Sequence, residues 1–269
     1  MDILETITAH KHKEVARQKE AVSLDLLFSL GSQRLNRPTL SMRQALERSS
    51  SGIIAEFKRR SPSKGWLFPH ARVEEVLPEY MNGGAAACSI LTDSEFFGGS
   101  FSDLQHARSL VPLPLLRKDF IVDEYQIYQS RVLGADAILL IAAILSKDTC
   151  KNLARAARQS EMEVLLEVHT ESELSHLNEY VDMFGVNNRN LGTFHTDVEN
   201  SFRMIDFLKK ETGAGGDAPL FISESGINDV NMINKLRAVG YRGFLIGESL
   251  MNGKMKIENL HENKSMRYA

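Results

Sequence analysis

The stretch DAILLIAAILSKDTCKNLARAARQSEMEVLLEV (136–168) contains the pattern that decides the fold. Two short apolar runs, 136–142 and 163–168, flank a segment of helical spacing, Thr149–Ser160. Near-continuous apolar runs predict strands that are covered on both faces, and a helix between two such strands predicts that the strands are parallel. We therefore interpret this stretch as a strand–helix–strand unit.

The same pattern, an apolar run followed by an amphipathic segment, recurs along the chain from Gly52 onward. Eight apolar runs alternate with amphipathic segments; the runs are GIIAEFK (52–58), AAACSIL (85–91), PLPLLRK (112–118), DAILLIA (136–142), EVLLEV (163–168), MFGVNN (183–188), PLFISE (219–224) and GFLIG (243–247). Further helices are expected at Asp123–Leu133, Glu171–Leu177, Asp197–Lys210 and Asn228–Val239. Eight units in about 220 residues predict a (β/α)₈ barrel. An open doubly wound sheet is the alternative, but it would require a glycine-rich turn that EFKRRSPSKG lacks.

The first 50 residues precede the barrel and form an N-terminal extension of a single domain that spans 1–269. Residues 2–21 carry spaced apolar side chains among charges, which predicts a surface helix with one docking face. A polar segment, 23–47, is expected to link this helix to the barrel. We expect the extension to act partly as a lid, so that removal of about 20 residues raises KM more than it lowers thermal stability.

Composition excludes several classes of function. The chain has 269 residues and a formal charge of −3, so no global basic field favours nucleic acid or an anionic membrane surface. No apolar run reaches the roughly 18 residues of a membrane span, and the charged N-terminus lacks the apolar region of a signal peptide. Two cysteines, Cys88 and Cys150, are too few for a disulfide framework, which favours a reducing, cytoplasmic location.

Charged residues stand where the apolar runs end. Active sites of (β/α)₈ barrels lie at the C-terminal ends of the strands, so these side chains are expected to converge. They are Glu56, Lys58, Lys118, Glu167, Asn187, Arg189, Glu224 and Ser225. Polar strand ends are common, but buried Lys and Glu must pair or serve a ligand.

Strand alternation further predicts that Lys118 points into the mouth while Arg117 and Asp119 face helices or loops. Mutual pKa shifts are expected to give this site an acid and a base near neutral pH.

Two glycines predict a phosphate site. SESGIND (223–229) and LIGESLM (245–251) place Gly226 and Gly247 at the last two strand ends, before helical segments whose backbone N–H groups can hold an anion. The basic run FKRRSPSKG (57–65) is interpreted as a phosphate-facing loop rather than a nucleic-acid patch. GAGGD (213–217) is expected to be a flexible loop.

Three histidines and Cys88 receive other interpretations. His10 and His12 point apart on a helix, so solvated surface positions are expected instead of a metal pair. His169 could support Glu167 or have a packing or capping role. Cys88 lies within a strand and is expected to behave as a small hydrophobic residue.

Seven motifs resemble a known family. They are ILETITAHKHKEVARQK, IAEFKRRSPSKG, LLRKDFI, LLEVH, VNNRNL, SESGI and LIGESLM, which together resemble indole-3-glycerol-phosphate synthase, a barrel enzyme of tryptophan biosynthesis. The resemblance runs from about Ile3 to about Met251, and the tail 252–269 lies outside it.

The resemblance implies a lyase that uses neither metal nor cofactor. Its reaction would convert 1-(2-carboxyphenylamino)-1-deoxyribulose 5-phosphate to indole-3-glycerol phosphate, releasing CO₂ and water. By the resemblance, Lys118 is a general acid, Glu167 is a catalytic carboxylate, and Glu56 and Lys58 serve dehydration and substrate placement. It leaves open which group serves each proton transfer.

The remaining site residues are implied in substrate-binding roles. By the resemblance they are Asn187 and Ser225 for orientation, Phe97 against the anthranilate ring, and Lys58, Ser61, Arg189, Gly226, Gly247 and Glu248 around the sugar phosphate. The expected partner is a small phosphorylated substrate, with no nucleic acid and no membrane, and other tryptophan-pathway enzymes could associate with the chain. Two alternatives are phosphoribosylanthranilate isomerase, which would be shorter and use a Cys/Asp pair, and a catalytically silent phosphometabolite-binding barrel.

Overall fold

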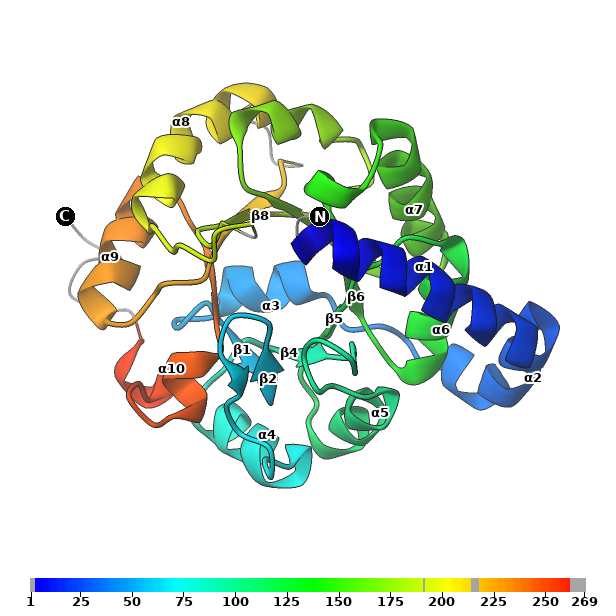
Figure 1. Cartoon of the computed structure of the whole chain (residues 1–269). Helices are drawn as coiled ribbons and strands as arrows, with labels where there is room; N and C mark the ends of the chain where they lie inside the picture. The colour runs from blue at the N-terminus through cyan, green and yellow to red at the C-terminus, as the bar shows by residue number, and fades with distance from the viewer. Residues whose placement is uncertain (1–2, 191, 214–217, 262–269) are drawn as a thin grey trace.

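Eight parallel strands close into a barrel (Figure 1). The computed structural model describes residues 3–190, 192–213 and 218–261. Around the barrel the strands are β1 (Ile53–Phe57), β10 (Gly243–Ile246), β9 (Leu220–Glu224), β8 (Met183–Asn187), β7 (Glu163–Val168), β6 (Ala137–Ile141), β5 (Leu115–Lys118) and β4 (Ala87–Leu91). Closure confirms the predicted (β/α)₈ barrel, contradicts the open sheet, and places a strand in each predicted run.

Helices cover the outside of the barrel. They are α4 (Val73–Asn82), α5 (Phe101–Leu110), α6 (Glu124–Leu133), α7 (Lys147–Gln159), α8 (Glu199–Thr212), α9 (Val230–Val239) and the short α10 (Glu248–Met251), with 3₁₀ turns η1 (Ala142–Ile144), η2 (Glu171–His176) and η3 (Ile257–Asn259). The predicted helix at Glu171–Leu177 is thus a 3₁₀ turn. Within η2 only Leu174 is buried, so this segment has one apolar anchor and no helical stripe.

Strand alternation separates an inner core from an outer one. Leu116 of β5 packs in the cluster inside the barrel, whereas Leu115 packs in the cluster under the helices. The same alternation along β7 places Leu165 inside and Leu166 outside. Since side chains alternate every residue, Lys118 and Glu167 continue the inner rows at the mouth.

The extension consists of three helices. α1 (Ile3–Ala21) confirms the predicted surface helix, but the polar segment 23–47 contains α2 (Leu24–Leu35) and α3 (Met42–Arg48) instead of a simple linker. Ser23 and Ser41 cap these two helices by accepting hydrogen bonds from Leu26 N and Gln44 N.

Each end of the extension packs on the barrel differently. α3 buries Met42 and Leu46 in the inner cluster and joins the start of β7, where Ser41 and the Arg43 amide bind the Glu163 carboxylate. α3 therefore covers the N-terminal end of the barrel. α1 instead contributes Ile7 to the same cluster from the mouth side, where Phe97 and Phe120 also pack.

Parts of two sequence predictions lie outside the described residues. Gly213 ends α8 with φ +70°, but 214–217 of the predicted flexible loop are not described, nor is 262–269 of the tail. Within the described ranges, no helix combines the length and the apolar character needed to cross a membrane.

Candidate active site

A pocket of about 370 Å³ opens at the C-terminal ends of the strands. All twelve predicted site residues line it; they are Glu56, Lys58, Ser61, Phe97, Lys118, Glu167, Asn187, Arg189, Ser225, Gly226, Gly247 and Glu248. Its other lining residues include Lys64, Phe120 and Glu224; the sequence places Glu224 among the converging strand ends but assigns it no role. The converging strand ends therefore form a single cavity, as the barrel topology requires.

The first strand contributes an ion pair. Lys58 Nζ lies 2.7 Å from Glu56 Oε1. Burial would raise the pKa of Glu56, but Lys58 and then Lys118 lower it below its ordinary value. Gly247 makes room for this carboxylate, because a Cβ there would lie 2.5 Å from Glu56 Oε1.

Lys118 lies between two carboxylates. Its Nζ is 3.1 Å from Glu167 Oε2 and 3.5 Å from Glu224 Oε2. Burial acts to lower the pKa of Lys118, but Glu167, Glu224 and Glu56 together raise it above its ordinary value. The expectation of neutral-range groups therefore does not hold for this lysine, which stays an ammonium ion.

Glu224 is the group whose pKa moves toward neutrality. Burial raises its pKa to about 8; Lys118 opposes the shift and Glu167 adds to it. Its side chain points over Gly185 of β8, where a Cβ would lie 2.2 Å from Glu224 Oε1. The sequence places Glu224 at a strand end but does not single it out as a site residue, because no local pattern distinguishes it from other polar strand ends.

Glu167 is held in the opposite protonation state. Burial would raise its pKa, but Lys118, His169 and a hydrogen bond from Asn187 lower it to about 2. His169 Nε2 is 3.5 Å from Glu167 Oε1, and its Nδ1 is 3.6 Å from Glu173 Oε2. His169 therefore combines the two interpretations left open: it supports Glu167 and packs against η2.

Arg117 faces away from the pocket, whereas Asp119 lines its edge. Arg117 donates to Thr92 Oγ1 at 3.0 Å, to Ser130 Oγ at 3.0 Å and to Asp119 Oδ2 at 3.0 Å. The predicted orientation is confirmed for Lys118, which points inward, and for Arg117, which binds α6 and the loop after β4. Asp119 pairs with Arg117 and Lys11 as a loop residue but also lines the pocket, which the prediction did not include.

The side of the pocket that follows β9 is formed by a sharp backbone turn. Ser225 has φ +68° and Gly226 has φ +77°, so the chain after β9 turns sharply through two left-handed residues. A Cβ on Gly226 would lie 2.7 Å from Thr196 Cγ2 and 2.8 Å from Val198 Cγ2. This loop has no space for a side chain at 226.

The basic loop after β1 was predicted to face the phosphate, and only part of it reaches the pocket. Strands β2 (Arg60–Ser61) and β3 (Gly65–Trp66) fold it into a hairpin that brings Ser61 and Lys64 to the pocket. Arg59 instead forms a bidentate pair with Asp103, at 2.6 and 2.8 Å, and Arg60 donates to Glu95 O. Arg59 thus holds this loop against the start of α5, and Arg60 holds it against the loop after β4, so both arginines serve protein contacts.

The interpretation of both N-terminal histidines as solvated is correct only for His12. His12 is exposed, but His10 is partly buried and packs edge-on against Phe96, with ring centroids 5.5 Å apart. Cys88 is fully buried in β4, as predicted. Within the described part of the chain, no group of three or more His, Cys, Asp or Glu side chains is arranged to hold a metal ion.

Comparison with known proteins identifies the family. The profile of indole-3-glycerol phosphate synthase matches residues 4–262. The chain belongs to the indole-3-glycerol phosphate synthase family. It is therefore a decarboxylating lyase of tryptophan biosynthesis that acts on a phosphorylated small molecule. This membership excludes the isomerase alternative.

Curated members of the family align over nearly the full chain. The indole-3-glycerol phosphate synthase of Bacteroides thetaiotaomicron is 51% identical over 261 residues, 96% of each chain. Those of Magnetococcus marinus and Neisseria gonorrhoeae are 43% and 41% identical, covering 94% and 93% of this chain and 94% of each relative. An N-acetylmannosamine-6-phosphate 2-epimerase from Clostridium perfringens superposes with a TM-score of 0.59 at 13% identity, over 80% of this chain and 93% of that one, which shows the shared fold alone.

Proposed function

We propose that Lys118 is the proton donor in ring closure of 1-(2-carboxyphenylamino)-1-deoxyribulose 5-phosphate. In this step the ring carbon that bears the carboxylate attacks the ketone carbon, and the ketone oxygen takes the proton. The C–CO₂ bond then breaks, its electron pair returns to the ring, and aromaticity is restored. The observation that carries the proposal is the Lys118 ammonium group held between Glu167 and Glu224 inside the pocket.

The substrate would lie across the pocket with its two ends in different surroundings. The phosphate is assigned to the backbone at Gly226 and Gly247, with Ser61, Lys58 and Glu248 around it. This placement is supported by the left-handed turn at Gly226 and by the start of α10 at Gly247. The anthranilate ring is assigned to the side lined by Phe97 and Phe120.

The Glu56–Lys58 pair would serve the dehydration. In this step the hydroxyl formed from the ketone leaves as water after protonation, and a proton leaves the carbon next to nitrogen. An acid and a base held 2.7 Å apart at the pocket wall suit these paired transfers. Asn187, Arg189 and Ser225 are proposed to orient the sugar chain, since Asn187 Oδ1 accepts the Arg189 amide at 3.0 Å and both side chains line the pocket.

No cofactor or metal takes part in this proposal, since lysine and carboxylate groups provide each proton transfer. We also propose a cytoplasmic location for a single-domain enzyme, supported by the two buried free cysteines, Cys88 and Cys150. Association with other enzymes of the pathway rests on the shared pathway alone.

A direct assay tests the proposal. Purified protein and 1-(2-carboxyphenylamino)-1-deoxyribulose 5-phosphate should give indole-3-glycerol phosphate, followed by the fluorescence of the indole product. Release of one CO₂ for each indole formed should accompany the signal. Absence of turnover by folded protein would contradict the activity, and Lys118→Ala with more than about a tenth of wild-type kcat would contradict the assigned donor.

A further inference from the structure

The docking face of α1 contains a buried lysine. Ile7, Lys11 and Val15 are spaced by four residues, so they form one stripe along the helix, and all three are buried. Lys11 has no exposed surface. A lysine in the middle of an otherwise apolar stripe is costly unless its charge is paired.

Lys11 is paired with three carboxylates. Its Nζ lies 2.8 Å from Asp93 Oδ2, 2.9 Å from Asp119 Oδ1 and 2.9 Å from Glu14 Oε2. Asp93 belongs to the loop after β4, and Asp119 directly follows β5. One ammonium group from the extension therefore joins two neighbouring loops at the barrel mouth.

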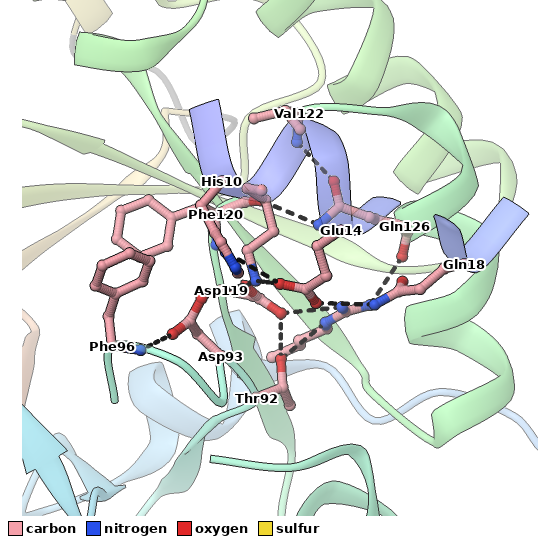
Figure 2. A network of polar contacts seen from close by, with 12 residues as sticks. His10, Glu14, Gln18, Thr92, Asp93, Phe96, Asp119, Phe120, Val122 and Gln126 are labelled. Atoms are coloured by element: carbon pink, nitrogen blue, oxygen red, sulfur yellow. Dashed lines mark hydrogen bonds and ion pairs between the residues drawn. The ribbon is translucent and has the colours of Figure 1, made fainter. Parts of the chain in front are cut away.

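Both aspartates also hold the backbone of aromatic residues (Figure 2). Asp93 Oδ1 accepts the Phe96 amide at 2.7 Å, and Asp119 Oδ1 accepts the Phe120 amide at 2.8 Å. Phe97, next to Phe96, and Phe120 line the pocket with ring centroids 5.9 Å apart. Two of the three carboxylates that bind Lys11 thus hold the backbone at Phe96, next to Phe97, and at Phe120.

We infer that Lys11 is a positioning residue that sets the aromatic wall of the substrate pocket. Lys11 does not line the pocket itself, so it acts through Asp93 and Asp119 on Phe97 and Phe120. The inference rests on the proposed function, in which this wall receives the anthranilate ring. It gives the N-terminal helix a specific part in recognising the aromatic half of the substrate.

The expected kinetic effect is on KM. A wall that packs on the aromatic ring stabilises the bound substrate and the transition state alike, and loss of such uniform binding raises KM with little change in kcat. The phosphate end, assigned to the loops after β9 and β10, should be unaffected. A purely structural role would instead weaken binding at both ends of the pocket.

The test compares Lys11→Met with Lys19→Met. Lys19 lies on the same helix and also joins α1 to the barrel, through a pair with Asp123 at 2.9 Å, but its side chain is 47% exposed and its partner is the N-cap of α6 and not one of the two aspartates that bind Lys11. For each variant, kcat and KM are measured, and the binding of anthranilate and of inorganic phosphate is measured by titration calorimetry. Lys11→Met should raise KM and weaken anthranilate binding by about tenfold, the scale of one aromatic contact. Its phosphate affinity should match wild type, and Lys19→Met should change none of these values.

A second variant guards against misfolding, because Lys11→Met leaves buried carboxylates unpaired. Lys11→Met combined with Asp93→Asn removes one charge of each sign and keeps an acceptor for the Phe96 amide; it should show the same rise in KM. Unchanged KM and anthranilate affinity in a folded variant would overturn the inference, as would equal loss of phosphate binding or failure of both variants to fold. Absence of turnover in wild type would contradict the proposed function, while the anthranilate titration would still test Lys11.

Discussion

Lys118 shows how one residue can be charged at the end of an apolar strand. β5 is buried along Leu115, Leu116 and Arg117, and only its last residue reaches the pocket. The buried ammonium group is stabilised because it pairs with the Glu167 carboxylate at 3.1 Å and lies 3.5 Å from Glu224 Oε2. These carboxylates also fix where the proton is held before the substrate arrives.

Replacing Lys118 by alanine should remove the proton donor. We expect kcat to fall by about 10²–10⁴, the usual contribution of general acid catalysis, while the protein stays folded and still binds inorganic phosphate. Lys118→Arg keeps the positive charge but should not restore activity, because the larger, planar guanidinium cannot place a donor where Lys118 Nζ lies between Glu167 and Glu224. Steady-state kinetics that retain more than about a tenth of wild-type kcat in Lys118→Ala would reassign the donor role.

The raised pKa of Glu224 predicts how kcat/KM falls at alkaline pH. With a pKa raised to about 8, this carboxyl is neutral at pH 7 and ionises as pH rises through about 8. If its neutral form is the active one, kcat/KM should fall above about pH 8. Glu224→Gln cannot ionise, so its profile should lack that fall. An unchanged fall in the variant would assign it to another group.

The same shift predicts a stability change of defined sign. Native Glu224 holds its proton up to about pH 8, whereas an unfolded glutamate releases it near its ordinary value of 4.5. Between these values the native state binds more protons, so the contribution of Glu224 to stability is full at low pH and is lost as pH rises. Denaturant unfolding of wild type and Glu224→Gln between pH 5 and about 8 should therefore show a steeper decline in wild type.

Gly226 tests the phosphate assignment. An aspartate there would force a side chain into Thr196 and Val198 and place a negative charge beside the phosphate, so KM should rise at least about tenfold. Gly253→Asp is the matched control, since Gly253 has φ +72° but no atom within 4 Å of the point that a Cβ would occupy. Equal kinetic effects of both substitutions would contradict a phosphate site at Gly226.

Among the elements, α1 contributes more than a cover over the barrel. The sequence predicted a helix that docks by apolar contacts and affects mainly KM. Its buried stripe instead contains Lys11, the countercharge of Asp93 and a partner of Asp119. α1 therefore joins the loops that surround the pocket.

Removing residues 1–21 should consequently affect both binding and stability. KM should rise, as the sequence predicted, because the aromatic loops lose their link. Removing one partner of a buried ion pair costs about 3–5 kcal/mol, which corresponds to a Tm lower by roughly 10 °C in a chain of this size. Thermal unfolding followed by circular dichroism checks this, and a Tm within about 2 °C of wild type would show that Asp93 finds another partner or solvent.

At the scale of the whole molecule, the mouth combines residues from nearly every strand without a metal-ligand set. Within the described residues no group of acidic side chains is arranged to hold a metal ion, and the acidic groups at the centre of the pocket lie against Lys58 and Lys118. Turnover should therefore survive exhaustive treatment with EDTA. Loss of kcat that added Zn²⁺ or Mg²⁺ restores would refute metal independence.

The strands and their inward residues were predictable because they depend on local pattern. Apolar runs and two-residue alternation are properties of neighbouring residues, and they correctly placed the eight strands and the inward direction of Lys118. The family motifs likewise marked twelve residues that line one pocket. The helices at 24–48 and the 3₁₀ turn at η2 were missed because capping and burial decide such short elements.

The protonation states and the role of α1 arise from contacts between residues far apart in the chain. Glu167 and Glu224 have the same ordinary pKa, and their different contacts with Lys118, His169 and Asn187 separate their pKa values to about 2 and about 8. Lys11 is one of several lysines in a charged helix until folding brings it to Asp93 and Asp119, 82 and 108 residues away. Electrostatic energies depend on distance and burial in three dimensions, so they cannot be predicted from local sequence pattern.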